Sequence, residues 1–181
     1  MRYVIGTALT LLTFISMTGL VLGDNDEREG RWGQRDVATV ENTQYRDECG
    51  SCHMAYQPGL LPERSWKKMM SQLDDHFGEN AELDDVDRLS LERYLVENAA
   101  DRSNFRRSNS IVKSIKKKHT PLRISETRYF VRKHDEVPVR AVGKKAKVKS
   151  FSQCQLCHQR ADQGFYNEDE VRIPGYGRWD D

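Results

Sequence analysis

The chain has 181 residues, of which 37% are hydrophobic and 31% are charged, and its formal net charge is +1. This length allows one domain or two small ones, and the polar composition excludes a protein held together by a large apolar core. Small polar chains often need a further source of stability, such as a disulfide, a metal or a large cofactor.

Residues 1–23 have the layout of a secretory signal peptide. The positive start, Met1-Arg2, precedes an uncharged apolar run over residues 3–22, and the chain turns acidic at Asp24. Cleavage is predicted after Gly23, which gives an exported protein. The alternative is a retained membrane anchor, but the apolar run is near the lower length limit for a span and contains Gly and Thr.

In the first half, the sequence predicts a polar lead-in followed by a small helical domain. Residues 24–45 are polar and are expected to be extended, and a first domain is predicted over residues 46–100. Within it, apolar positions recur at helical spacing over residues 62–73 and 84–97, the second with Asp84 or Asp85 as its cap. The apolar positions are Leu61, Trp66, Met69, Met70 and Leu73 for the first helix, and Leu83, Val86, Leu89, Leu91, Tyr94 and Leu95 for the second.

The composition changes at Asp101, which marks a candidate boundary to a second domain over residues 101–181. Residues 101–120 hold few large apolar side chains and many cations, so a basic connecting stretch is predicted there.

In the second half, the sequence predicts shorter secondary-structure elements. Residues 125–134 are expected to form a helix with Ser125 as its N-cap. Residues 136–149 are basic and rich in Val, which indicates some strand or extended character. Residues 151–160 are expected to be helical, and the segment 173–177 is expected to be irregular.

The four cysteines form two Cys-x-x-Cys pairs, and His follows each pair directly. This is the signature of covalent haem attachment, in which two thiols add to the vinyl groups of the porphyrin and the next His binds the iron. The motifs are Cys49-Gly50-Ser51-Cys52-His53 and Cys154-Gln155-Leu156-Cys157-His158.

Two other uses of such cysteines fit this sequence less well. A redox-active dithiol of the thioredoxin type would require one motif in a βαβ pattern, which this sequence lacks. A zinc site would require tighter spacing than the 105 residues from Cys49 to Cys154. The sequence therefore predicts two covalently bound haem c groups, with His53 and His158 as proximal iron ligands.

Three histidines remain as candidates for the sixth iron ligand. His76 lies just beyond the predicted helix 62–73 and His134 ends the predicted helix 125–134, so both are favoured as distal ligands. His119 lies in a strongly basic stretch before Pro121 and is expected to be exposed. We expect each distal His to serve the nearer motif, although a crossed arrangement stays open.

Methionine is the rival sixth ligand. Met54 is too close to the first motif, and Met69 and Met70 lie on a helix face where core methionines are common. Two His ligands would favour a low reduction potential and would close the iron, whereas an open iron would favour gas binding or peroxidase chemistry.

The charge is distributed unevenly. Residues 24–100 contain 9 basic and 18 acidic side chains, whereas residues 101–150 contain 16 and 4. The basic runs at 113–118 and 144–149 are either a solvated face or a docking patch for an acidic redox partner. Nucleic acid is not expected as a partner, because export and haem argue against it.

Several segments together resemble the bacterial dihaem cytochrome c family, often called DHC. The resemblance covers residues 46 to about 170. The segments that carry it are Glu48 to Tyr56, Gly59 to Pro62 with Trp66, Leu73 to Ala81, Ile124 to His134, and Cys154 to His158.

The resemblance implies a mainly α protein with two small helical cytochrome c domains, class-I-like or irregular, each built around one haem. It also implies His76 and His134 as distal ligands and a periplasmic location. Members of the family carry electrons and are associated with an oxygen-binding monohaem cytochrome and a membrane cytochrome b. The family therefore implies redox partner proteins and no small-molecule substrate.

The predicted function is electron transfer between a membrane cytochrome or quinol-side donor and a soluble redox partner, without enzymatic activity. One alternative is a dihaem peroxidase with one open iron, although such proteins are usually much longer. Another is a small dihaem subunit of a periplasmic reductase, which would act in an obligate complex.

Overall fold

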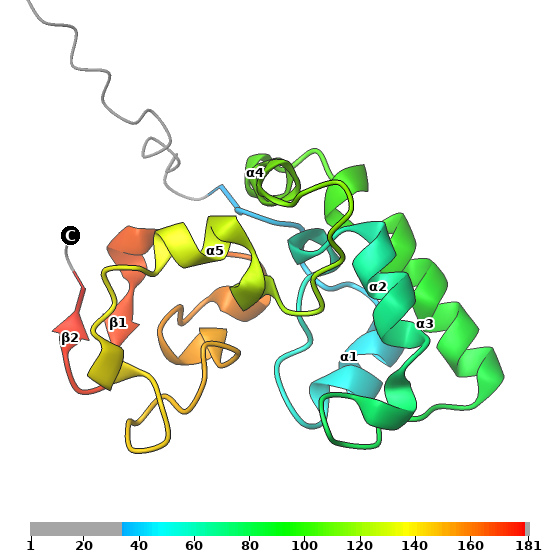
Figure 1. Cartoon of the computed structure of the whole chain (residues 1–181), viewed down its shortest axis with the longest axis horizontal. Helices are drawn as coiled ribbons and strands as arrows, with labels where there is room; N and C mark the ends of the chain where they lie inside the picture. The colour runs from blue at the N-terminus through cyan, green and yellow to red at the C-terminus, as the bar shows by residue number, and fades with distance from the viewer. Residues whose placement is uncertain (1–33, 180–181) are drawn as a thin grey trace, which may run out of the picture.

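The computed structural model describes residues 34–179, so the predicted signal peptide over residues 1–23 and the first ten residues of the lead-in lie outside the described residues. The described part is mainly helical, as predicted, and short 3-10 helices join its elements. Figure 1 shows α1, α2 and α3 in one half, α5 with the β1–β2 hairpin in the other, and α4 above the junction. The elements are α1 (Thr43–Gly50), α2 (Glu63–Met70), α3 (Asp85–Glu97), α4 (Arg106–Ser114), α5 (Arg128–Lys133), β1 (Arg172–Ile173) and β2 (Gly177–Arg178).

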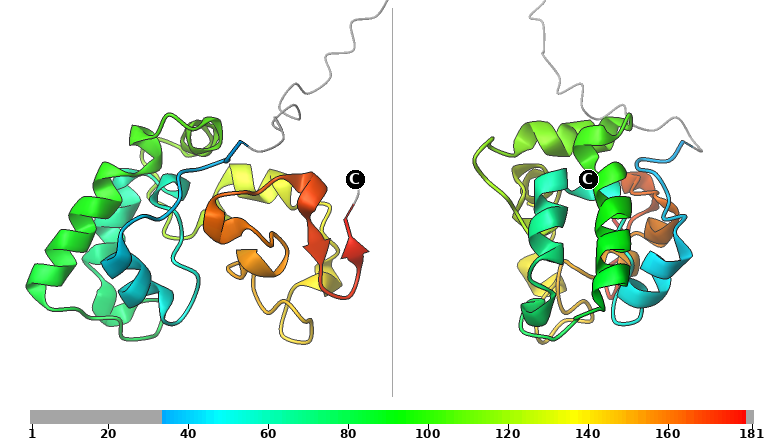
Figure 2. Two further views of the ribbon diagram at one scale, coloured as in Figure 1. Left: turned by 180° about the vertical axis from the view of Figure 1, so that it is seen from behind. Right: turned by 90° about the vertical axis from the view of Figure 1, so that its right-hand side faces the viewer.

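The two helices predicted in the first half are confirmed. Helix α2 begins directly after Pro62, and α3 begins after Asp84, whose carboxylate accepts hydrogen bonds from the backbone N–H groups of Val86 and Asp87. The two helices lie side by side (Figure 2). With α1 they enclose the largest apolar cluster, which comprises Tyr45, Leu61, Trp66, Met70, Leu73, Leu91, Leu95 and Ala99.

The basic stretch 101–120 is more than a connection, because its centre forms helix α4. Ile111 and Ile115 lie one turn apart on one face and are both buried, so this short apolar stripe anchors the helix. They form a second cluster with Val37, Leu60 and Tyr129, which come from three other segments. The helix that follows the expected boundary thus packs against both halves.

Residues 34–42 of the lead-in form no helix or strand and are docked against the second half, whereas its last three residues already belong to helix α1. The Val37 side chain is fully buried, and the N–H groups of Asp36 and Val37 donate to the carbonyl of Gly164 at 2.9 and 3.3 Å. Gly164 has a φ of 84°, and a Cβ there would collide with the carbonyl oxygen of Val37. The close approach of the two backbones therefore requires glycine at position 164.

The helix predicted over residues 125–134 is shorter than expected and has a different cap. Ile124–Glu126 form a 3-10 helix, and Thr127 is the N-cap of α5 because its hydroxyl accepts a hydrogen bond from the N–H of Phe130. Ser125 is therefore not the cap. The helix ends at Lys133, and His134 occupies the C-cap position.

The prediction of a helix over residues 151–160 was wrong. Only Cys154–Leu156 form a 3-10 helix there. Side chains in this segment instead accept hydrogen bonds from nearby backbone N–H groups. The Gln153 side chain accepts one from the Lys149 N–H, and the Ser150 hydroxyl accepts one from the Ser152 N–H. Such bonds compete with a helix.

Two further expectations for the second half need correction. Residues 136–149 contain the 3-10 helix Val139–Ala141 and a single bridge between Val142 and Val148, and no named strand lies in this part of the described chain. The tail that was expected to be irregular forms the β1–β2 hairpin, in which Ile173 pairs with Gly177. Ile173 is buried in a third apolar cluster with Ala141 and Val171, which explains why the hairpin forms.

Within residues 34–179, no helix is both long enough and apolar enough to cross a membrane.

Candidate functional site

The first motif lies at the end of helix α1. Cys49 is in the last turn, and Cys52 and His53 follow where the helix has ended. The imidazole of His53 faces that of His76, with ring centroids 6.1 Å apart and ring planes 21° apart. The Nδ1 atom of His53 lies 2.8 Å from the carbonyl oxygen of Met54. This contact places the proton on Nδ1 and leaves Nε2 free to bind a metal.

A tight turn presents His76 to this site. His76 follows the 3-10 helix Leu73–Asp75, and its N–H donates to the Glu79 carbonyl at 2.8 Å. Phe77 has a φ of 59°, which is unusual for a residue with a side chain. The Arg123 guanidinium stacks on the Phe77 ring at 3.7 Å and so holds the turn from the second half of the chain.

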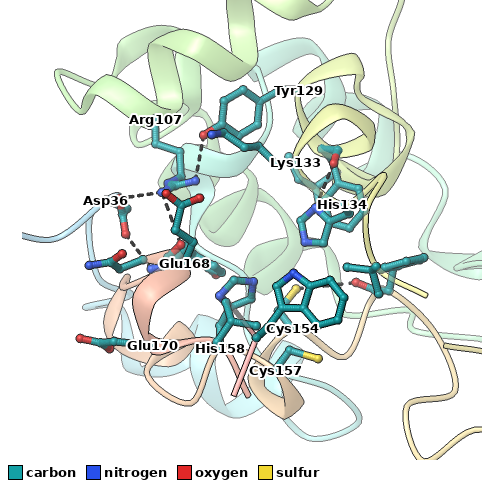
Figure 3. A pocket seen from close by; sticks show the side chains of 18 of the residues that line it. Asp36, Arg107, Tyr129, Lys133, His134, Cys154, Cys157, His158, Glu168 and Glu170 are labelled. Carbon is teal, nitrogen blue, oxygen red and sulfur yellow. Dashed lines mark hydrogen bonds and ion pairs between the residues drawn. The ribbon is translucent and has the colours of Figure 1, made fainter. Parts of the chain in front are cut away.

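The second motif faces His134 across a cavity (Figure 3). The rings of His134 and His158 have centroids 6.1 Å apart, and their planes differ by 73°. The Nδ1 atom of His134 lies 2.9 Å from the Phe130 carbonyl oxygen, one turn earlier in α5. As at His53, this arrangement leaves Nε2 for a metal.

Both ring separations fit a single metal ion between two imidazoles. A metal-bound imidazole nitrogen lies about 2 Å from the ion, which puts the ring centroid about 3 Å away, so two opposite rings would have centroids about 6 Å apart. The structure therefore pairs His53 with His76 and His134 with His158, each distal candidate with the nearer motif.

The cavity at the second site also has the size and lining that a haem requires. Its volume is about 630 Å³, within the range of ligand sites. Apolar side chains such as Ile111, Phe130 and Val171 line it together with Cys154 and Cys157, and both acidic and basic side chains also line it. The apolar part of this lining matches the apolar macrocycle of a haem.

The protonation of the described groups agrees with haem attachment. Burial lowers the pKa of His158 to about 4, with nearby His134 as the next cause, and burial also lowers the pKa values of His76 and His134. Neutral imidazole is the form that binds iron. Burial raises the pKa of the Cys49 and Cys154 thiols to about 11, whereas a redox-active dithiol requires a lowered thiol pKa.

The remaining candidates lie elsewhere. His119 is exposed, as predicted. Met70 is 3% exposed and belongs to the core of the first half, and Met69 packs against that core.

Sequence reasoning missed the residues that join the two sites. Tyr56 stacks on His53 with centroids 5.1 Å apart, and its hydroxyl donates to the carbonyl of Ser152, two residues before Cys154. The amide of the neighbouring Gln57 is fully buried and accepts a hydrogen bond from the Tyr166 hydroxyl at 2.7 Å. The Tyr166 ring lies 5.4 Å from that of His158. The sequence signal available was a Tyr-Gln pair three residues beyond His53 of the first motif.

The fold and the two sites define a c-type cytochrome with two haem sites in one small helical chain. A family model described as dihaem cytochrome c matches residues 45–166. No curated protein sequence matches significantly. The chain is similar to the solved diheme cytochrome c of Shewanella baltica, with 43% identity, a TM-score of 0.64, and coverage of 78% of this chain and 99% of that one. It is also similar to the diheme cytochrome c of Rhodobacter sphaeroides, with 44% identity, a TM-score of 0.63, and coverage of 72% and 100%.

This chain belongs to the dihaem cytochrome c family. Membership means two covalently bound haem c groups and a role in electron transfer.

Proposed function

We propose that this chain is a periplasmic electron carrier in which both irons are closed by two histidines. Cys49 and Cys52 would attach one haem between His53 and His76. Cys154 and Cys157 would attach the other between His158 and His134. The observation that carries the proposal is the 6.1 Å centroid separation in both histidine pairs.

Haem c supplies reversible one-electron chemistry when it is bound. The two histidine pairs would hold each haem iron from both sides and would leave no open position of the kind that peroxidase or gas-binding chemistry needs. Tyr56 and Gln57 connect the two sites through direct contacts, so an electron would have a packed path between them. The geometry thus favours a carrier over an enzyme.

The proposed partners follow from the charged surfaces around the two sites. Asp74, Asp75 and Glu79 are exposed beside His76, whereas exposed Lys144, Lys145, Lys147 and Lys149 precede the second motif. The acidic surface near the first site and the basic surface near the second would each attract and orient a different partner of opposite charge. We propose a membrane cytochrome, such as a cytochrome b on the quinol side, as donor, and a soluble acceptor such as an oxygen-binding monohaem cytochrome.

Carbon monoxide binding to the reduced protein tests the closed sites. The wild-type protein should keep its optical spectrum under carbon monoxide, because both sixth positions are filled. The variants His76→Ala and His134→Ala should each bind carbon monoxide at one iron, and His119→Ala should behave as wild type. Rapid binding at one haem of the wild-type protein would overturn the proposal and favour a peroxidase-like enzyme.

A further inference from the structure

The two histidine pairs differ in the relative orientation of their rings. The planes of His53 and His76 are 21° apart, whereas those of His134 and His158 are 73° apart, although the centroid separations are the same. The first pair is therefore nearly parallel and the second nearly perpendicular.

Ring orientation matters because each imidazole interacts with the iron dπ orbital that lies perpendicular to its plane. Parallel rings raise one dπ orbital above the other, and low-spin ferric iron then removes its electron from the raised orbital. Ferrous iron fills both orbitals and gains nothing from the splitting. Parallel rings thus favour the oxidised state, and perpendicular rings give that state less stabilisation and so raise the reduction potential.

Aromatic contacts hold the His134 ring in its orientation. It stacks on Phe130 with centroids 3.7 Å apart and planes 9° apart. Phe151 packs edge-on against both rings, at 5.5 Å from Phe130 and 5.7 Å from His134. The hydrogen bond from Nδ1 to the Phe130 carbonyl removes the remaining freedom of the imidazole. Rotation of His134 about its side-chain bonds would break all of these contacts.

Burial acts in the same direction as the ring angle. His134 and His158 are partly buried and face a cavity lined by protein, whereas His53 is exposed, and burial disfavours the more highly charged oxidised state. Hydrogen bonding does not separate the two sites, because one Nδ1 atom in each pair contacts a carbonyl oxygen, that of His53 at the first site and that of His134 at the second.

We propose that Phe130 and Phe151 are positioning residues that hold His134 perpendicular to His158, and that the His134–His158 site is consequently the one of higher potential. The half-reduced protein would then hold its electron at the second motif. This inference rests on the proposed function, because it assumes that these four histidines bind the two irons.

Electron paramagnetic resonance of the oxidised holoprotein tests the ring orientation without any variant. Two different low-spin signals are expected, one rhombic signal from the parallel pair and one strongly anisotropic, large-g signal from the perpendicular pair. The anisotropic signal should disappear first during a reductive titration. Two rhombic signals, or loss of the rhombic signal first, would overturn the inference. A high-spin signal would instead contradict the proposed ligands.

Variants at position 130 assign the signal to the second site. Phe130→Leu keeps an apolar side chain but removes the stacked ring, so the anisotropic signal should shift towards a rhombic one and the interval between the two potentials should narrow. Phe130→Tyr keeps the stacked ring and should leave the anisotropic signal and the interval between the two potentials unchanged. The rhombic signal should persist in both variants. An unchanged anisotropic signal in a low-spin Phe130→Leu protein would show that Phe130 does not position His134.

Discussion

The carboxylate of Asp36 and the guanidinium of Arg107 form an ion pair at 2.9 Å that joins the extended N-terminal segment to helix α4. Both side chains are largely buried, with 11% and 13% of their surface exposed. Asp36 also accepts a hydrogen bond from the Tyr166 N–H, and Arg107 donates to the Tyr129 hydroxyl. The pair therefore ties together four segments around the second haem site (Figure 3).

Replacement of Arg107 should strongly destabilise the protein. Arg107→Ala leaves the Asp36 carboxylate buried without its cation, which costs about 3–5 kcal/mol in the free energy of unfolding. Chemical denaturation of the holoprotein measures this loss. Lys113→Ala, an exposed position on the same helix, should change the free energy by less than about 0.5 kcal/mol. A loss from Arg107→Ala as small as that of the control would contradict the role given to the pair.

Glycine at position 164 should be required for docking of the N-terminal segment. Gly164→Ala combines a positive φ with a collision against the Val37 carbonyl. Gly175→Ala is a matched control, since Gly175 has a similar φ of 96° but open space around its missing Cβ. The control should lose about 1–2 kcal/mol from backbone strain alone, and Gly164→Ala should lose more. Amide exchange should also become faster at Asp36 and Val37 in Gly164→Ala alone; equal effects of the two variants would argue against the collision.

The buried side-chain amide of Gln57 should stabilise the fold through its hydrogen bonds to two partners. Its Nε2 donates to the Ala161 carbonyl, and its Oε1 accepts from Tyr166. Gln57→Leu should cost about 1–3 kcal/mol, because buried polar partners lose their hydrogen bonds. In a double-mutant cycle, Gln57→Leu with Tyr166→Phe should cost less than the sum of the single changes. Additive losses would mean that the two side chains do not depend on each other.

The N-cap of helix α3 should stabilise the first half. The Asp84 carboxylate accepts from the N–H groups of Val86 and Asp87, both at 3.0 Å. Asp84→Ala should therefore lower the free energy of unfolding by about 0.5–2 kcal/mol. Asp85→Ala removes an equal charge that makes only an exposed pair with Arg88, so thermal unfolding should show a clearly smaller loss. A larger loss from Asp85→Ala would assign the effect to charge rather than to capping.

The sequence by itself predicted the features that depend on neighbouring residues. The spacing of each Cys-x-x-Cys-His motif indicated covalent haem attachment, and membership of the dihaem family confirms two haem c groups. The helices around Trp66 and Leu91 followed from apolar positions one turn apart, because burial of one helix face is a local pattern. The candidates His76 and His134 followed from their places at the ends of predicted helices.

Only the tertiary structure decided how the two halves fit together and how the rings are oriented. The Tyr166 hydroxyl meets Gln57, 109 residues away in the sequence, and Asp36 meets Arg107 across 71 residues. No local pattern encodes such pairs, because they depend on packing of the whole chain. The same holds for the angle between His134 and His158, which is set by stacking on Phe130 and by the position of Phe151. The angle between the two rings cannot be read from the Cys-x-x-Cys-His motif, because it arises only when both segments are packed around one cavity.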